Sequence, residues 1–253
     1  MRIAVAGYGR MGRLIRQKVI ARGYEAPVVI DPNCSAPEVT ASELTSTALP
    51  LDVIIDFTTP DVVLRNIERY GELGLTAVIG TTGWYSEMEK VAEIVEKSGI
   101  GLIWSGNFSL GVNLFFQLIE AAGKIMNRFS QYDVMVHEYH HRHKADSPSG
   151  TAQMIGELLI AGLDRKRNIV TDSLNRQIEE SEIHISSTRG GSIPGIHRVS
   201  FDSEVDTIIL EHSARDRGGF ADGALLAAEW IYGRSGLFSI DDLMQSVIRG
   251  EKI

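Results

Sequence analysis

A glycine-rich turn near the amino end constrains the fold more than any other feature of this sequence. The apolar run Ile3–Ala6 leads directly into Gly7-Tyr8-Gly9-Arg10-Met11-Gly12, and a helical pattern follows over 10–22. In such a strand–turn–helix unit the glycines permit a tight turn and a close approach to a pyrophosphate, which the helix N-terminus attracts. We therefore expect this turn to bind a dinucleotide. The alternative is a purely structural glycine turn in another α/β fold.

A carboxylate about 20 residues further along bears on the choice of dinucleotide. The apolar run Val28–Ile30 ends at Asp31, where an acidic side chain can hydrogen-bond a ribose diol and repel the 2′-phosphate of NADP. Residues 32–35 contain no Lys or Arg, although Arg10 and Arg13 lie near the expected phosphates and offer partial compensation. The sequence predicts NADH as the preferred cofactor, with NADPH as the other candidate.

The first hundred residues alternate short apolar runs with amphipathic helical stretches. Further buried runs are 53–57, 77–79 and 101–104, each followed by turn residues. Continuous apolar runs with helices between them indicate a parallel sheet covered on both faces. We expect an α/β fold with a doubly wound, Rossmann-type dinucleotide-binding domain. The segment 32–50 lacks a clear helical period, so one crossover is expected to be irregular.

The pattern changes after Asn107 and indicates an inserted domain of α+β build. A helical stretch over 110–128 is followed by an alternating run over 133–138 and by a polar loop over 140–150 that opens a second helix. Two further alternating runs, 183–186 and 205–210, flank a turn-rich segment over 189–195. The tail 221–253 is interpreted as two helices around 233–236. The expected domains are 1–107 plus 218–253 for the dinucleotide and 108–217 for the substrate, with hinges near Asn107 and Gly218.

Composition excludes several classes of partner. The 253 residues carry 33 acidic and 25 basic side chains, a formal charge of -8, which disfavours nucleic acid and anionic membranes as partners. Cys34 has no partner for an intrachain disulfide, so a reducing compartment is expected. No apolar run approaches the ~20 residues that span a bilayer. We expect a cytoplasmic protein.

A dense group of ionisable residues carries the most informative chemistry. Four of the seven histidines fall within 137–143, Lys144 follows, and Ser149-Gly150-Thr151 begins a helix after a proline. Imidazoles exchange protons near neutral pH, cations attract carboxylates, and free helix amides bind anions. This combination indicates a small carboxylate-bearing substrate. A solvated basic turn and a metal site are the alternatives; the spacing matches no zinc pattern, and we expect no metal.

The loop over 140–152 resembles the signature loop of the bacterial dihydrodipicolinate reductase family, also called 4-hydroxy-tetrahydrodipicolinate reductase. The resemblance extends over nearly the whole chain, and further matching segments occur in the family's order, at 7–12, 55–60, 79–83, 106–113 and 220–224. Two departures are visible. Ser147 stands where alanine is common in the family, and the segment after Asp31 is short.

The resemblance implies an activity. Members of the family transfer a nicotinamide hydride to a cyclic unsaturated imine dicarboxylate. The substrate arrives as 4-hydroxy-tetrahydrodipicolinate, water is lost, and tetrahydrodipicolinate forms on the diaminopimelate route to lysine. The resemblance also implies a homotetramer joined through sheets of the second domain, for which the strands around 183–188 and 205–211 are candidates.

The same resemblance assigns site residues. His140 and Lys144 are the expected catalytic acids, and which of them delivers the proton stays open. The expected substrate-binding residues are His141, Lys144, Ser149, Gly150 and Thr151, of which Ser149 comes from the helix-start argument. The expected cofactor-binding residues are Gly7, Tyr8, Gly9, Arg10, Met11, Gly12, Asp31, Gly80, Thr81, Thr82, Ser105, Gly106, Asn107 and Phe108.

Two other functions remain as alternatives. One is another two-domain NAD(P)-dependent dehydrogenase of amino-acid or sugar metabolism, because one fold serves many chemistries. The other is an NADH-sensing regulator, which would need no proton donors in its second domain. Arg215 and Arg217 are either surface charges or contacts to cofactor or substrate.

Overall fold

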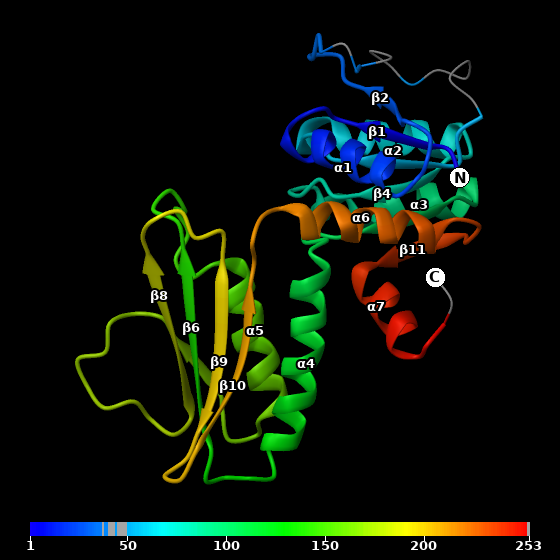
Figure 1. Cartoon of the computed structure of the whole chain (residues 1–253). Helices are drawn as coiled ribbons and strands as arrows, with labels where there is room; N and C mark the ends of the chain where they lie inside the picture. Colours follow the sequence, from blue (N-terminus) through cyan, green and yellow to red (C-terminus); the bar gives the residue numbers. More distant parts are fainter. Residues whose placement is uncertain (37, 40–43, 45–49, 252–253) are drawn as a thin grey trace. The chain divides into compact units, whose positions relative to one another are not determined.

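The computed structural model describes residues 1–36, 38–39, 44 and 50–251. The chain divides into two compact units, one formed by Met1–Leu110 with Gly218–Ile253 and the other by Gly111–Arg217. Each unit is described by itself (Figure 1). Part of the crossover expected to be irregular, within 32–50, lies outside the described residues.

The first unit is built on a six-stranded parallel sheet with the order β11-β5-β4-β3-β1-β2. The chain starts at β1, the second strand from one edge, runs outward to β2 at that edge, and then returns to β3 on the other side of β1. Such a reversal of strand order creates a ligand-binding position at the carboxyl ends of the strands. The strands are β1 Ile3–Ala6, β2 Val28–Ile30, β3 Val53–Asp56, β4 Thr76–Ile79, β5 Gly101–Trp104 and β11 Gly236–Ser239.

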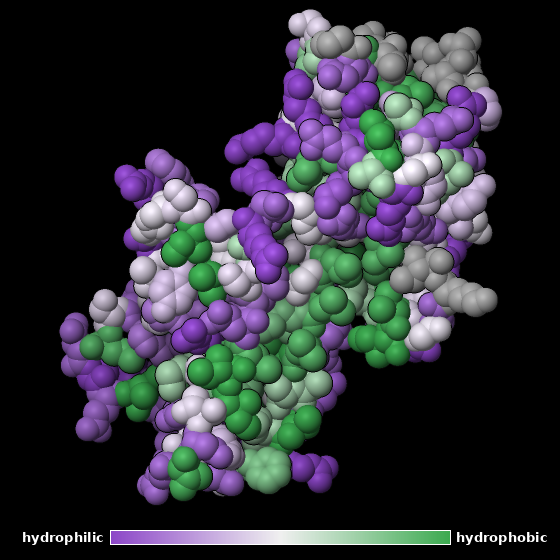
Figure 2. All heavy atoms as spheres, viewed as in Figure 1, coloured by the Kyte–Doolittle hydropathy of each residue, from purple (hydrophilic) through white to green (hydrophobic). Residues whose placement is uncertain are grey.

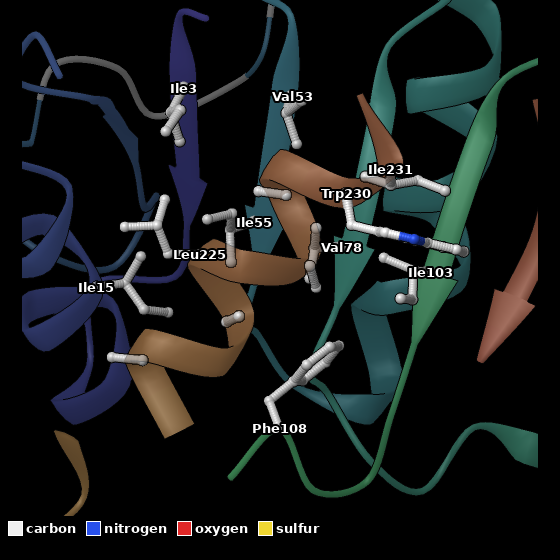
Figure 3. Close-up of a cluster of buried hydrophobic side chains, with 14 of the residues drawn as sticks. Ile3, Ile15, Val53, Ile55, Val78, Ile103, Phe108, Leu225, Trp230 and Ile231 are labelled. Atoms are coloured by element: carbon white, nitrogen blue, oxygen red, sulfur yellow. The ribbon is translucent and has the colours of Figure 1, made fainter. Parts of the chain in front are cut away.

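Helices cover both faces of this sheet because successive strand residues point to opposite sides. Ile3 and Val5 pack in one cluster with residues of α1 and α6, and Ala4 and Ala6 pack in a second cluster with residues of α2 and α3. Figure 3 shows the first cluster, in which Leu225 and its neighbours on α6 face the strand side chains. The doubly wound fold is confirmed. The helices are α1 Arg10–Ala21, α2 Pro60–Glu72, α3 Met88–Ser98, α6 Gly218–Ile231 and α7 Ile240–Ile248, with a 3-10 turn η2 at Tyr85–Glu87.

The second unit is an α+β structure, as expected. Its mixed sheet has the order β10-β9-β6-β8-β7, in which β6 runs antiparallel to β9 and parallel to β8. Helices α4 and α5 share one buried cluster with the inner face of this sheet. The elements are α4 Leu110–Met126, β6 Asp133–His140, α5 Gly150–Gly162, β7 Asn168–Val170, β8 Glu182–Arg189, β9 Ile196–Asp202 and β10 Thr207–Ser213.

Three strands were not predicted from the sequence, namely β7, β9 and β11. β11 interrupts the tail that the sequence suggested was only helical, and it extends the first sheet by pairing with β5. It has only four residues, too few to show a period of two. β9 fills the interval between the two alternating runs of the second unit. Its buried side chains, His197, Val199 and Phe201, do alternate, so the signal for β9 was present.

Several hydrophobic side chains remain on the surface of the second unit. Figure 2 shows hydrophobic surface over α4, where Leu118 and Ile125 are each 59% exposed. On the sheet, Met135 and Ile209 pair with the same residue of β9, so they share its outer face. Among the described residues, no helix combines the length and apolar character needed to cross a membrane.

Candidate functional site

The three glycines of the amino-terminal turn are required for different reasons. Gly7 adopts a φ of +85°, and a Cβ there would lie 2.6 Å from the carbonyl oxygen of Phe57. A Cβ on Gly12 would overlap the carbonyl oxygen of Gly7 itself. A Cβ on Gly9, by contrast, would meet no atom within 4 Å. Packing within the protein therefore requires glycine at 7 and 12, whereas Gly9 borders open space of the kind a bound pyrophosphate needs.

Helix α1 begins at this turn with its amides available. Its N-cap is Gly9, and no described side chain caps the helix. The first-turn N–H groups of a helix lack intrahelical acceptors and, with the helix dipole, attract anions. The first turn contains Arg10, Met11 and Gly12, so these residues fit the phosphates of a dinucleotide.

Asp31 lies directly beside the glycine turn. Its two carboxylate oxygens accept hydrogen bonds from the backbone N–H groups of Tyr8 and Asn33, both at 2.8 Å. The guanidinium of Arg13 lies 4.5 Å from the ring centroid of Tyr8, and its Nη2 is 3.8 Å from the sulfur of Cys34. The structure thus places one carboxylate and one cation next to the end of β2.

Buried Asp56 holds the next predicted cofactor segment. Its carboxylate accepts hydrogen bonds from the hydroxyls of Thr58, Tyr70 and Thr81 at 2.7, 2.7 and 3.1 Å. Burial beside this anion raises the pKa of Tyr70 well above its usual value. Thr81 therefore faces inward and fixes the loop after β4, which also contains Gly80 and Thr82. No side chain fits at Gly80, because its Cβ would overlap the ring of Phe57.

A second polar loop follows β5. The Ser105 hydroxyl donates to the carbonyl oxygen of Asn107 at 2.9 Å and accepts from the Asn107 N–H at 3.0 Å. Phe108 is buried beneath this loop against α6, and Gly106 lies beside the Tyr85 hydroxyl. The predicted cofactor residues of the first unit thus follow β1, β2, β4 and β5. The carboxyl ends of parallel strands share one edge of a sheet, so the fold gathers all these segments there.

In the second unit, Glu138 is the centre of a buried polar cluster. One of its carboxylate oxygens, Oε1, accepts hydrogen bonds from the Ser149 N–H, the Ser187 hydroxyl and the Arg189 guanidinium at 2.9, 2.8 and 2.7 Å. Burial alone would raise the pKa of Glu138, but these hydrogen bonds outweigh it and hold the pKa at about 2. Glu138 is therefore an anion at neutral pH.

His140 ends β6 beside this anion. Its Nδ1 is buried and lies 3.1 Å from Oε2 of Glu138. Its Nε2 lies beside Gly195, where a Cβ would come within 2.9 Å of it. Burial lowers the pKa of His140; Glu138 opposes this shift, whereas nearby Lys144 and Arg189 add to it. The ring thus has one nitrogen facing an anion and the other facing a position without a side chain.

Lys144 is the second predicted acid, and it lies in the turn after β6. Its ammonium is 2.9 Å from the Asp146 carboxylate, and a hydrogen bond from Lys144 lowers the pKa of Asp146. The backbone N–H of Lys144 donates to the carbonyl oxygen of His141, and that of His141 donates to Ile193. These bonds fix the turn that carries His141 and Lys144, both predicted to bind the substrate.

The predicted anion site at the start of α5 is smaller than expected. The Ser149 N–H donates to Glu138, and the Ser149 hydroxyl caps the helix by accepting from Ala152 at 3.2 Å. Ser149 is thus occupied within the protein. The N–H groups of Gly150 and Thr151 lie in the first turn, where a helix offers no acceptor. A Cβ on Gly150 would meet no atom within 4 Å, so this position is open to a ligand.

Three residues of this cluster were missed in the sequence interpretation. Glu138, Arg189 and His197 come from β6, β8 and β9, and the sheet register places Glu138 directly opposite His197. The alternation of β6 did contain part of the signal, because it places Glu138 on the same inner face as Val134 and Val136. Arg215 and Arg217, whose role was open, are exposed.

The cluster also bears on the metal alternative. Glu138, His140 and His197 each offer a ligand atom, and these atoms lie within 4.8 Å of one another. The guanidinium of Arg189 already pairs with Glu138 at 2.7 Å, and Lys144 adds a second positive charge nearby. Positive charge at this distance opposes a metal cation. A site without metal therefore stays the prediction.

Comparison with known families gives two matching family models. Family models described as dihydrodipicolinate reductase, N-terminus, and dihydrodipicolinate reductase, C-terminus, match residues 1–108 and 111–244. The chain belongs to the dihydrodipicolinate reductase family. The resemblance noted in the sequence is thereby confirmed, and the family consists of NAD(P)-dependent oxidoreductases with a Rossmann-type domain.

Curated relatives and solved structures extend this finding. Proteins named 4-hydroxy-tetrahydrodipicolinate reductase from Christiangramia forsetii and Archaeoglobus fulgidus are 33% and 37% identical, over 98% and 97% of this chain and 100% of each relative. The structure of a dipicolinate-bound dihydrodipicolinate reductase from Paenisporosarcina sp. TG-14 superposes with a TM-score of 0.76 at 24% identity. It covers 94% of this chain and 97% of its own, so the family fold extends over both units.

Proposed function

We propose that this protein reduces 4-hydroxy-tetrahydrodipicolinate, by way of dihydrodipicolinate and with loss of water, to tetrahydrodipicolinate in the diaminopimelate route to lysine. The observation that supports this most strongly is the family membership of both units, together with the acid and cation cluster of the second unit. Two curated relatives are named after this activity, and each is matched over its full length.

In this proposal the dinucleotide domain expected from the sequence, 1–107 with 218–253, binds the cofactor, which when bound supplies a hydride. The first-turn amides of α1 hold its pyrophosphate, Asp31 takes the ribose diol, and the loops after β4 and β5 line its nicotinamide end. The open position at Gly9 and the uncapped helix support this assignment.

The substrate domain expected from the sequence, 108–217, binds the cyclic dicarboxylate and supplies the proton. His141, Lys144 and the N–H groups of Gly150 and Thr151 hold the carboxylates. Addition of a hydride builds electron density on the ring, and a nearby cation stabilises that density until an acid, His140 or Lys144, delivers the proton. Hydride and proton together complete the two-electron reduction of one double bond.

The proposal is tested by measuring NADH oxidation with freshly prepared aldol product of pyruvate and aspartate semialdehyde. Substrate-dependent oxidation of one NADH per product supports the reductase. An enzyme that oxidises NADH only with another amino-acid or sugar precursor would instead be a different two-domain dehydrogenase. Binding of NADH without turnover of any of these compounds would favour a regulator.

We expect this enzyme to prefer NADH over NADPH. The Asp31 carboxylate beside the glycine turn repels a 2′-phosphate, and Arg13 is the cation near it. Michaelis constants for both cofactors, measured on one preparation, should give a higher kcat/KM for NADH. Asp31→Asn should lower the ratio of kcat/KM for NADH to kcat/KM for NADPH, because the variant should use NADPH better. A preference of the unchanged enzyme for NADPH would contradict the assignment.

A homotetramer in the cytoplasm is also part of this proposal. The exposed apolar side chains Met135 and Ile209 on the outer face of the second sheet support self-association through that face. Light scattering should give the mass of four chains. Ile209→Asp should lower that mass, and Ile20→Asp, at an exposed position in the first unit, should not. A monomeric mass for the unchanged protein would overturn the prediction; the cytoplasmic location remains a prediction from the sequence.

A further inference from the structure

Glu138 has a divided carboxylate. Three donors, Ser149, Ser187 and Arg189, bind its Oε1, whereas Oε2 accepts no hydrogen bond of good geometry from any described residue. The nitrogen that lies nearest to Oε2 among the recorded ion pairs is Nδ1 of His140 at 3.1 Å, and it too is buried without another partner in the described part of the chain. The two atoms lie 3.1 Å apart, within hydrogen-bond distance, but their geometry does not form a hydrogen bond in the structure.

The sheet explains why these two groups meet. Residues at i and i+2 of a strand share one face, so β6 places Glu138 and His140 side by side on the inner face. The register sets Ser187 opposite Glu138 on one side, His197 opposite it on the other, and Arg189 opposite His140. The neighbouring strands thus hold the carboxylate by one oxygen and aim the other at His140.

We propose that Glu138 is a positioning residue for the reduction: its Oε2 takes the Nδ1–H of His140, fixes the ring in one tautomer, and directs Nε2 toward the substrate. This inference rests on the proposed function for its kinetic consequences. A buried carboxylate also stabilises the imidazolium that must form before His140 donates a proton. Glu138 itself touches no reacting atom.

His197 completes the surroundings of this pair. Its Nε2 is 3.6 Å from Oε2 of Glu138 and 3.2 Å from the Ser149 hydroxyl. Burial, with a smaller effect from His140, lowers the pKa of His197 to about 4. His197 is therefore neutral at pH 7 and leaves Glu138 with one imidazole to charge, that of His140. Lys144 and Arg189 are the cations that oppose this charging, and His141 lowers the pKa of His140 in the same direction.

Glu138→Gln tests the proposal. We expect kcat to fall by more than about tenfold, yet by less than the loss of His140 itself, because general acid catalysis is typically worth about 10²–10⁴-fold. Loss of the anion should also move the limb of the kcat/KM profile that reports His140 to lower pH by about one unit. The Michaelis constant for NADH should not change.

Glu182→Gln is the matched control. Glu182 is also a buried carboxylate of this sheet with a pKa of about 2 and an arginine partner, Arg176 at 2.6 Å. It begins β8, whereas Arg189, the residue that pairs with Glu138, ends it. We expect this variant to keep the kcat and the pH profile of the unchanged enzyme. Equal losses in both variants would mean that Glu138 only stabilises the sheet.

Two further measurements keep the inference falsifiable. In the double variant Glu138→Gln/His140→Gln, the loss should be close to that of His140→Gln alone, because Glu138 acts through His140; a multiplied loss would overturn the proposal. Glu138→Asp keeps an anion for Arg189, so it should fold even if the Gln variant does not, and it should shift the pH limb less while still lowering kcat. An unaltered kcat in the Asp variant would contradict the positioning role.

A spectroscopic readout separates this inference from the proposed function. Two-bond ¹H–¹⁵N correlation spectra should show His140 as the Nδ1–H tautomer in the unchanged protein and as a mixture in Glu138→Gln, with the signals identified by their loss in His140→Gln. This result is independent of any substrate. An Nε2–H tautomer in the unchanged protein would overturn the proposal about Glu138, whereas a correct tautomer without turnover of the dicarboxylate would count against the proposed function alone.

Discussion

His140→Gln should lower kcat by about 10²–10⁴-fold while NADH binds with nearly unchanged affinity. The reason is that His140 lies in the second unit, whereas the segments assigned to the cofactor lie in the first. Lys144→Ala should lower kcat as well and should also raise the Michaelis constant of the dicarboxylate, because it removes a cation from the anion-binding turn. Steady-state kinetics with both substrates varied, together with NADH titration by fluorescence, measures each effect.

The pH dependence of kcat/KM distinguishes the two candidate acids. A general acid must be protonated to act, and burial lowers the pKa of His140 below its usual value of about 6.5. If His140 delivers the proton, the rate should fall as the pH rises through a value below 6.5. If His140 is not the donor, the rate should show no such fall over this pH range.

The variants His140→Gln and Lys144→Ala, together with His197→Gln, distinguish three interpretations of the cluster. A metal site predicts chelator sensitivity, bound metal in the purified protein, and a loss of kcat in His197→Gln as severe as in His140→Gln. A solvated basic turn predicts near-normal kinetics for all of these variants. Near-normal kcat in both His140→Gln and Lys144→Ala would contradict the mechanism proposed here.

Gly12→Ala should damage folding and cofactor binding together. The added Cβ would overlap the carbonyl oxygen of Gly7, a backbone atom that cannot move without opening the turn. Forced overpacking of this kind costs about 1–3 kcal/mol in free energy of unfolding. Thermal unfolding should show a lowered midpoint, and titration should show that NADH binding is lost.

Gly9→Ala is the contrasting control in the same turn. Gly9 has a φ of -75°, which alanine adopts readily, and its Cβ would meet no protein atom within 4 Å. The free energy of unfolding should therefore stay within about 0.5 kcal/mol of that of the unchanged protein. NADH should still bind at least about tenfold more weakly, because the methyl group occupies the approach of the pyrophosphate. Normal NADH affinity in this variant would contradict the assignment of the glycine turn to the cofactor site.

Local patterns in the sequence account for the first unit and for the reactive loop. The strand, glycine turn and helix over 3–21 are contiguous, and the apolar runs of the parallel sheet are short, continuous and separated by turn residues. The acids, cations and anion-binding helix start of 140–151 lie within a dozen residues. Features of this kind depend on neighbours along the chain, so local patterns predicted the doubly wound fold and the inserted α+β domain. The roles of His140 and Lys144 as candidate acids came from the resemblance of this loop to the family.

Only the tertiary structure decided what surrounds those acids. Glu138 meets Ser187, Arg189 and His197 across strand pairings that join residues about 50 to 60 positions apart, and its contacts depend on the register of β6 with β8 and β9. A shift of register by one residue would turn these side chains to the other face of the sheet. The occupied amide of Ser149 follows from the same pairing. Sequence periodicity determines which face of a strand is buried, but it does not state which strand lies beside it, and that choice sets the environment of His140.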